Sequence, residues 1–180
     1  MEDRKPRQLD GEGLWNYALR ALGGRAHSTR EMREKLRRRA ARMSDVDEVI
    51  ERLKDSKYLD DRRFAEGFAS ARLSNERFGK TRVLQDLRGR RIAAGLAEKT
   101  VGEVYRDVDE AALIEEWVRR KYRLAPREGL FQEDKDMASA YRRLLRAGFR
   151  TGEIVRVLKK FARNPELLDS FEPPEETSDS

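Results

Sequence analysis

The chain contains no cysteine among its 180 residues and has one histidine, His27. The first absence excludes disulfides, thiolate metal sites and cysteine nucleophiles, and the second excludes a site built from several histidines. No apolar run approaches the ~18 residues of a membrane-spanning helix, and residues 1–10 lack the apolar segment of a signal peptide. The sequence therefore predicts a cytoplasmic protein that has no contact with a membrane.

Sequence motifs that carry catalysis are missing as well. The chain has neither a GxxxxGK[ST] phosphate loop nor a GxSxG nucleophile elbow. The nearest approach to paired catalytic carboxylates is Asp60 beside Asp61, but neighbouring residues of a helix project about 100° apart and do not converge on one ion. We interpret Asp60 as a helix cap and Asp61 as a residue of the first turn. The sequence predicts no enzymatic activity, no catalytic residue, no metal site and no cofactor.

Three single residues have both a functional and a structural interpretation. His27 could act as a pH switch, and Trp15 and Trp117 could stack on nucleic-acid bases. His27 directly precedes an expected helix start, however, and each tryptophan falls on the apolar face of its helix. We therefore favour ordinary packing roles for all three.

Apolar residues are scarce and charged residues are abundant. The hydrophobic share is 38% and the charged share 41%, against about 45–50% and about 25% in an average globular chain. A single compact core would need more apolar surface than this. The composition favours an array of thin helical units, each with a narrow apolar stripe that packs against its neighbours.

Charge is distributed unevenly along the chain. Residues 165–180 hold six acidic and no basic side chains, so the other residues carry 40 basic and 28 acidic side chains, a net charge of +12. This balance favours an acidic partner, either nucleic acid or an acidic protein surface, although a solubilising surface would have the same composition. The acidic segment contains three prolines and is predicted to be a disordered tail.

Apolar spacing predicts nine helices in three groups of three, and no strand. Ser28 and Glu31 have the pattern of a capping box, and Ser44 is expected to cap the third helix. The repeat can be followed in register through the apolar pairs of the middle helices: Met32 and Leu36, Val83 and Leu87, Tyr141 and Leu145. The predicted fold is all-α, with a leader at 1–12, three-helix repeats at 13–57, 58–108 and 109–164, and the tail at 165–180.

The middle helix of each predicted repeat is basic on the side opposite its apolar stripe. Taking about 100° per residue, the same-sign faces recur three times. Arginine dominates over lysine, which suits paired hydrogen bonds to phosphates or carboxylates. The candidate partner-binding or DNA-binding residues are Arg30, Arg33, Arg37, Arg82, Arg88, Arg142, Arg143 and Arg146.

Three segments of the sequence match a known protein family. The first contains Ala18-Leu19, Leu22, Arg25, Ser28, Glu31-Met32 and Leu36. The second contains Leu53, Tyr58-Leu59-Asp60-Asp61 and Arg63-Phe64-Ala65, and the third contains Arg72, Gly79, Arg82-Val83 and Leu87. With these segments the chain resembles the bacterial RecX family, modulators of the RecA recombinase. The second segment is the most specific of the three.

The sequence departs from the family pattern at a few positions. Lys57 stands where the family commonly has glycine before the tyrosine. Gln85-Asp86-Leu87 replaces the usual Glu-Leu ending, and Arg88-Gly89-Arg90-Arg91-Ile92 departs from the usual Lys-Gly-Ile.

The resemblance implies an elongated, curved array of three-helix repeats that acts as a monomer. Such a protein would lie along the filament that RecA forms on single-stranded DNA, and would modulate, most simply inhibit, recombinase, ATPase and co-protease activities in DNA recombination, DNA repair and the SOS response. No catalytic residue belongs to that mechanism. The alternative is a stand-alone nucleic-acid-binding protein that uses the same arginine faces.

The segment from Tyr58 to Ala65 is interpreted as the connection between the first two repeats. We expect Tyr58 and Leu59 to close the first repeat, Asp60 to cap the next helix, and Phe64 to be buried in its core. Together with Asp61, Ala65 and Gly79 these residues form the structural motif of the family, and we do not expect the partner to bind there.

Overall fold

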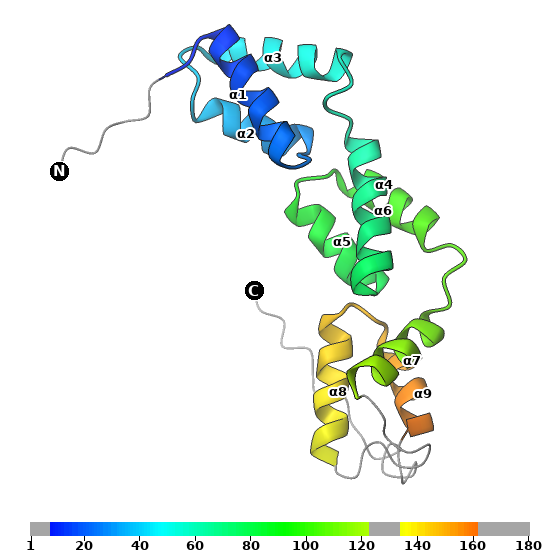
Figure 1. The fold of residues 1–180 in the computed structure, drawn as a ribbon. Helices are drawn as coiled ribbons and strands as arrows, with labels where there is room; N and C mark the ends of the chain where they lie inside the picture. The colour runs from blue at the N-terminus through cyan, green and yellow to red at the C-terminus, as the bar shows by residue number, and fades with distance from the viewer. Residues whose placement is uncertain (1–7, 123–133, 162–180) are drawn as a thin grey trace, which may run out of the picture. The chain divides into compact units, whose positions relative to one another are not determined.

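The computed structural model describes residues 8–122 and 134–161 (Figure 1). In these two stretches the chain forms nine α-helices, one short π-helical segment and a single isolated bridge between Leu9 and Ala40, so the predicted all-α fold is confirmed. The predicted tail at 165–180 lies outside the described residues. No helix in the described part of the chain is both long and apolar enough to cross a membrane.

Contacts between Cα atoms divide the chain into two compact units. Unit 1 comprises Met1–Ser70 with Leu84–Val104, and unit 2 comprises Ala71–Val83 with Tyr105–Ser180.

The first three helices of unit 1 pack around one core. They are α1 (Gly11–Gly24), α2 (Thr29–Arg37) and α3 (Met43–Asp55), with α3 packed against both of the others. The buried core residues are Leu14, Ala18, Met32, Leu36, Val46, Val49, Ile50, Leu53 and Leu59. The apolar periods read from the sequence thus converge on a single interior.

The starts of these helices show which local predictions hold. Ser28 and Glu31 form the predicted capping box of α2. The prediction that Ser44 caps α3 is wrong, because α3 begins at Met43 and Ser44 lies in its first turn. Arg42 occupies the cap position there, and its guanidinium lies 3.1 Å from the buried carboxylate of Asp45. Helix α1 begins at Gly11, inside the expected leader.

Three helices follow in sequence. They are α4 (Asp61–Ala71), α5 (Lys80–Gly89) and α6 (Ala94–Val104), with the π-helical segment Arg72–Glu76 after α4. Buried side chains recur along each helix at helical spacing: Ala65 and Ala69 on α4, Val83 and Leu87 on α5, and Ala97, Thr100 and Val101 on α6. The small residues on α4 allow close packing of this helix.

The last three helices form the core of unit 2. They are α7 (Glu110–Lys121), α8 (Asp134–Arg146) and α9 (Thr151–Phe161), and α9 packs against both others (Figure 1). Asp109 caps α7 by accepting hydrogen bonds from the N–H groups of Ala111 and Ala112. The largest fully buried side chain is Tyr141, whose hydroxyl lies 3.5 Å from Thr151 Oγ1.

Helices α5 and α8 end in the same kind of turn, as expected for repeated units. The N–H of Ile92 donates to Leu87 O over 3.1 Å, and the N–H of Phe149 donates to Leu144 O over 3.3 Å. The residue before each donor is left-handed: Arg91 at φ 63° and Gly148 at φ 88°. Glycine is the favoured residue in this position because it has no Cβ to clash. Arg91 thus occupies the place of the glycine in the family's Lys-Gly-Ile.

Gly79 allows the start of α5 to approach the turn between α8 and α9 within unit 2. Its N–H donates to Ala147 O over 2.8 Å, and the N–H of Thr81 donates to Gly148 O over 3.2 Å. A Cβ built on Gly79 would clash with the backbone carbonyl of Gly148, and a Cβ on Gly148 would clash with the backbone N of Arg82. Two glycine backbones are therefore required for this contact.

We predict that Gly79→Ala destabilises unit 2 by about 1–3 kcal/mol, because backbone has to move to admit the methyl group. The measurement is urea unfolding followed by tryptophan fluorescence in a Trp15→Phe background, where Trp117 alone reports on unit 2. Gly152→Ala in α9 of the same unit serves as the control, since a Cβ there meets no atom within 4 Å. An unfolding midpoint for Gly79→Ala equal to that of the parent protein would contradict the prediction.

Candidate functional site

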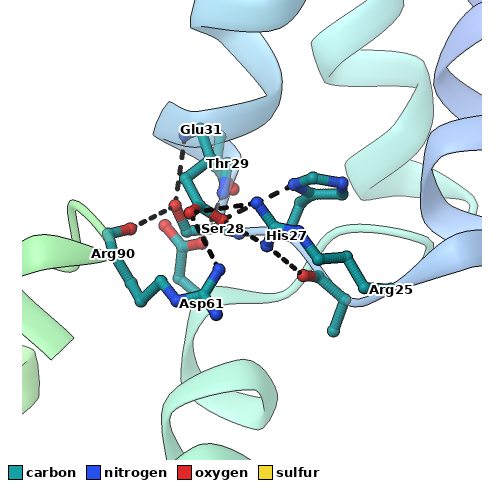
Figure 2. Close-up of polar contacts among 8 residues, drawn as sticks. Arg25, His27, Ser28, Thr29, Glu31, Asp61 and Arg90 are labelled. Carbon is teal, nitrogen blue, oxygen red and sulfur yellow. Dashed lines mark hydrogen bonds and ion pairs between the residues drawn. The ribbon is translucent and has the colours of Figure 1, made fainter. Parts of the chain in front are cut away.

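The motif segment Tyr58–Ala65 lies in unit 1, where the start of α2 meets the start of α4 and the turn after α5 (Figure 2). Asp61 contributes a carboxylate from α4, Arg90 a carbonyl and a guanidinium from the turn, and Glu31 a carboxylate from α2. We call the set formed by Ser28, Thr29, Glu31, Asp61 and Arg90 the joint. It connects segments that are more than 30 residues apart in sequence.

The two adjacent acids of the motif serve two different helices. Asp60 Oδ1 accepts a hydrogen bond from Arg63 N–H over 3.0 Å, which confirms that Asp60 caps α4. Asp61 Oδ1 accepts from the N–H of Thr29, the first residue of α2, over 2.7 Å. Each carboxylate therefore satisfies a backbone N–H at the positive end of a helix. The role of Asp61 across the joint was not predicted from the sequence.

Ser28 contributes hydrogen bonds in two directions. Its hydroxyl oxygen accepts from the N–H of Glu31 over 3.1 Å, and its hydroxyl donates to the carbonyl of Arg90 over 2.6 Å. The side chain is fully buried. A hydroxyl is needed for both functions, since it can accept and donate at the same time.

Glu31 receives most of the remaining hydrogen bonds of the joint. Its carboxylate accepts from Ser28 N–H and from the guanidinium groups of Arg25 and Arg90, each over 3.2 Å. Burial raises the pKa of Glu31, but the hydrogen bonds from Arg25, Ser28 and Arg90 outweigh it and leave the pKa below its usual value of 4.5. The ionised carboxylate is the form that holds the joint together.

His27 is buried beside this carboxylate. Its Nδ1 lies 3.6 Å from Glu31 Oε2, which is longer than a good hydrogen bond. Burial, and after it the positive charge of Arg25, lower the pKa of His27 below 6.5 despite the nearby carboxylate. The imidazole thus packs in its neutral form, consistent with the structural interpretation of this residue.

A groove with a volume of about 690 Å³ lies next to the joint in unit 1. Three residues of the family motif line it, namely Tyr58, Asp60 and Phe64. The other lining residues are Leu22, Ala26, His27, Ser56, Lys57, Arg63, Gly67 and Phe68.

Two expectations for the motif aromatics are corrected by the structure. Leu59 is buried as predicted, but Tyr58 is 54% exposed and only its ring edge contacts Trp15, at 6.1 Å between centroids. Phe64 is half-buried rather than a core residue, and it stacks on Phe68 with 6.0 Å between ring centroids. The apolar face of α4 was predicted correctly. Part of this face borders the groove, and the apolar pattern of a sequence does not show whether another element covers such a face.

The candidate arginines fall into two groups. Arg30, Arg37, Arg142, Arg143 and Arg146 are exposed and form no ion pair with another residue in 8–122 or 134–161. The other three have partners: Arg33 lies 3.3 Å from Asp47, Arg88 lies 3.3 Å from Glu98, and Arg82 donates to Arg146 O over 3.3 Å. Within each unit the exposed arginines of one helix share a face; α2 and α8 each present such a face.

Both tryptophans are partly buried against the core of their own unit. The guanidinium of Arg52 lies 3.9 Å from the ring centroid of Trp15, and Trp117 contacts Tyr122 edge-on at 6.4 Å. Trp117 also lines a second groove with Phe78, Arg77 and Arg120 in unit 2. Packing accounts for both rings, as expected.

No three His, Asp or Glu side chains in the described stretches come together in a way that could hold a metal ion.

Comparisons with known proteins decide the family. The model described as the first three-helix domain of RecX matches residues 15–53, and the model of the second three-helix domain matches residues 60–101. A regulatory protein RecX of Salmonella arizonae is 30% identical over 172 residues, which are 90% of this chain and 99% of that protein. The chain belongs to the RecX family.

Other RecX proteins agree with this assignment. The regulatory protein RecX of Deinococcus radiodurans is 35% identical over 153 residues, 81% of this chain and 66% of that protein. The crystal structure of RecX from Lactobacillus salivarius matches with a TM-score of 0.64 over 90% of this chain and 98% of its own, at 18% identity. The second likeness concerns the fold alone, and it supports the all-α repeat architecture.

The family motif of RecX therefore has a structural explanation in this chain. Asp60 and Asp61 cap two helices, and Leu59 closes the core of the first three-helix domain. Sequence reasoning missed Arg90, Gly67 and the second role of Ser28. The available signal for Arg90 was its place in the segment Arg88–Ile92, which departs from the family's Lys-Gly-Ile.

We predict that Glu31→Gln weakens unit 1 by about 1–3 kcal/mol near neutral pH, because two guanidinium groups lose their charged acceptor. The pKa of Glu31 is lower in the folded than in the unfolded state, so its stabilising contribution is complete above pH 4.5 and is lost as the pH falls through the folded-state value. The difference in unfolding free energy between wild type and variant should accordingly shrink below pH 4.5.

The measurement is urea unfolding at a series of pH values in a Trp117→Phe background, where Trp15 reports on unit 1. Glu48→Gln is the matched control, an exposed carboxylate on α3 that takes no part in the joint. A difference that stays constant from pH 7 to pH 3 would exclude the ionised Glu31 as its source.

Proposed function

We propose that this RecX-family protein binds the filament that RecA forms on single-stranded DNA and inhibits RecA's ATPase, recombinase and co-protease activities. Family membership across both three-helix domains is the observation that carries the proposal. The protein acts as a monomer in the cytoplasm and needs no cofactor. Regulation then follows from binding and not from chemistry performed by the chain.

The exposed arginines supply contacts of the right sign. Filament DNA presents phosphates, and arginine guanidinium groups pair with phosphates or carboxylates through two parallel hydrogen bonds. Arg30 and Arg37 on α2, and Arg142, Arg143 and Arg146 on α8, are exposed for such contacts. We leave Arg82 out of the proposed contacts, because its guanidinium lies 5.4 Å from the Phe78 ring centroid and donates to Arg146 O at the end of α8.

A stand-alone nucleic-acid-binding function is the second candidate, favoured by the same arginine faces. The two candidates differ in what they require. The first predicts that binding depends on RecA, and the second predicts comparable affinity for bare single-stranded DNA near physiological salt.

The first experiment titrates the protein into RecA with single-stranded DNA and follows ATP hydrolysis. We expect inhibition at a ratio of one protein to several RecA protomers. Undiminished hydrolysis at an equimolar ratio would refute the proposal. Fluorescence anisotropy of labelled oligonucleotide without RecA, measured in the same buffer, separates the second candidate from the first.

The arginine contacts are tested by single substitutions. We predict that Arg37→Ala and Arg142→Ala each weaken binding to the filament and reduce the slope of log affinity against log salt by about 1 for a lost phosphate contact. Arg119→Ala is the control, since this arginine is also exposed but already pairs with Glu115 on α7. Equal salt slopes for all four proteins would remove the arginines from the interface.

A further inference from the structure

The groove beside the joint has an open, partly apolar lining. Phe64 and Phe68 stack on each other along α4, and Leu22 contributes a further apolar side chain. Tyr58 stands beside them with half of its surface exposed. Because Phe64 and Phe68 are only half-buried, part of their apolar surface stays in contact with water. Covering that surface with another apolar group would be favourable.

Gly67 on the groove wall is a glycine within a helix. It lies in the interior of α4, where glycine costs about 1 kcal/mol relative to alanine. The fold does not require it, because a Cβ at this position would meet no heavy atom within 4 Å. Gly67 lines the groove between Phe64 and Phe68, and because glycine has no side chain the groove stays open at this point. A glycine without a steric reason inside the protein suits close approach by another molecule.

The rim of the groove carries positive charge. The rim carries Lys57 and Arg63, both exposed and without an ion pair to another described residue. The one carboxylate that lines the groove belongs to Asp60, and it already accepts the N–H of Arg63 as a helix cap. His27 at the edge of the groove is held neutral by burial. The charges that remain available are positive and favour an occupant with a carboxylate.

We propose that this groove is a docking site for a short protein segment that carries an apolar side chain beside a carboxylate. The apolar side chain lies over Gly67 against Phe64 and Phe68, and the carboxylate pairs with Lys57 or Arg63. The paired apolar rings of Phe64 and Phe68 favour a protein segment with an apolar side chain. Because the two cations would also pair with phosphates, binding to bare single-stranded DNA is measured beside filament binding. The segment belongs to RecA, an assignment that rests on the proposed function.

Filling the groove tests the proposal without removing any contact of the fold. Gly67→Trp places a large side chain where the occupant would lie, and binding to RecA filaments should weaken by about tenfold or more, the loss typical of a blocked central contact. Gly67→Ala adds only a methyl group and should bind within about twofold of wild type, with a raised melting temperature from the better helix propensity.

Gly95→Trp is the matched control for the added bulk. Gly95 is an exposed residue of α6 in the same unit, no heavy atom lies within 4 Å of its Cβ position, and it does not line the groove. The readouts are filament binding by anisotropy, binding to bare single-stranded DNA, and the melting temperature of each variant. Lys57→Glu with Arg63→Glu tests the charge, and should weaken filament binding as Gly67→Trp does.

Each outcome decides between the two proposals. If wild type binds filaments and Gly67→Trp binds equally well, the groove is not the docking site, whereas the proposed function stands. If wild type does not bind RecA filaments, both fail together. An equal loss for Gly95→Trp, or a loss of bare-DNA binding in Gly67→Trp, would also overturn the docking of a protein segment here. Weakened filament binding by Gly67→Trp, together with wild-type affinity for Gly95→Trp, supports the proposal.

Discussion

The ionised carboxylate of Glu31 is the constraint on which the joint of unit 1 depends. It is partly shielded from water, and it accepts hydrogen bonds from α2's own capping serine and from two arginines that come from different segments. A carboxylate in this position is stabilised only while all of these donors remain, because burial by itself favours its neutral form. The start of α2, the loop before it and the turn after α5 are therefore fixed by one group.

Asp61 adds a second link of the same kind. Its carboxylate, in the first turn of α4, accepts a hydrogen bond from the N–H of Thr29, the first residue of α2. The start of α4 itself is capped by Asp60, so an acidic residue of the motif serves each helix start. Unpaired N–H groups at a helix start require an acceptor wherever water is excluded. This need explains two consecutive acids in the family motif better than metal binding or catalysis does.

The sequence predicted the helices well because each one carries an apolar stripe at helical spacing, and it predicted the capping box because that signal is local. It failed for Ser44, since Arg42 and the buried Asp45 organise the start of α3 through a contact that no local pattern contains. It also could not find the partners of Asp61 or the clash that makes Gly79 and Gly148 necessary, because both depend on segments brought together only by folding. Which arginines are exposed and unpaired likewise required the structure.

Three departures from local rules meet at the groove. Gly67 lies inside the continuous helix α4 without a steric reason, Phe64 occupies the apolar face but stays half-buried, and Lys57 holds a left-handed backbone at φ 59° where glycine would be less strained. Arg91 shares the backbone strain of Lys57 but does not line this groove, so strain alone does not mark the site. It is the coincidence of a missing side chain, two half-buried aromatic rings and an exposed cation along one surface that folding does not explain. Sequences usually agree with their fold at every level, and local disagreements of this kind concentrate where a protein binds something else.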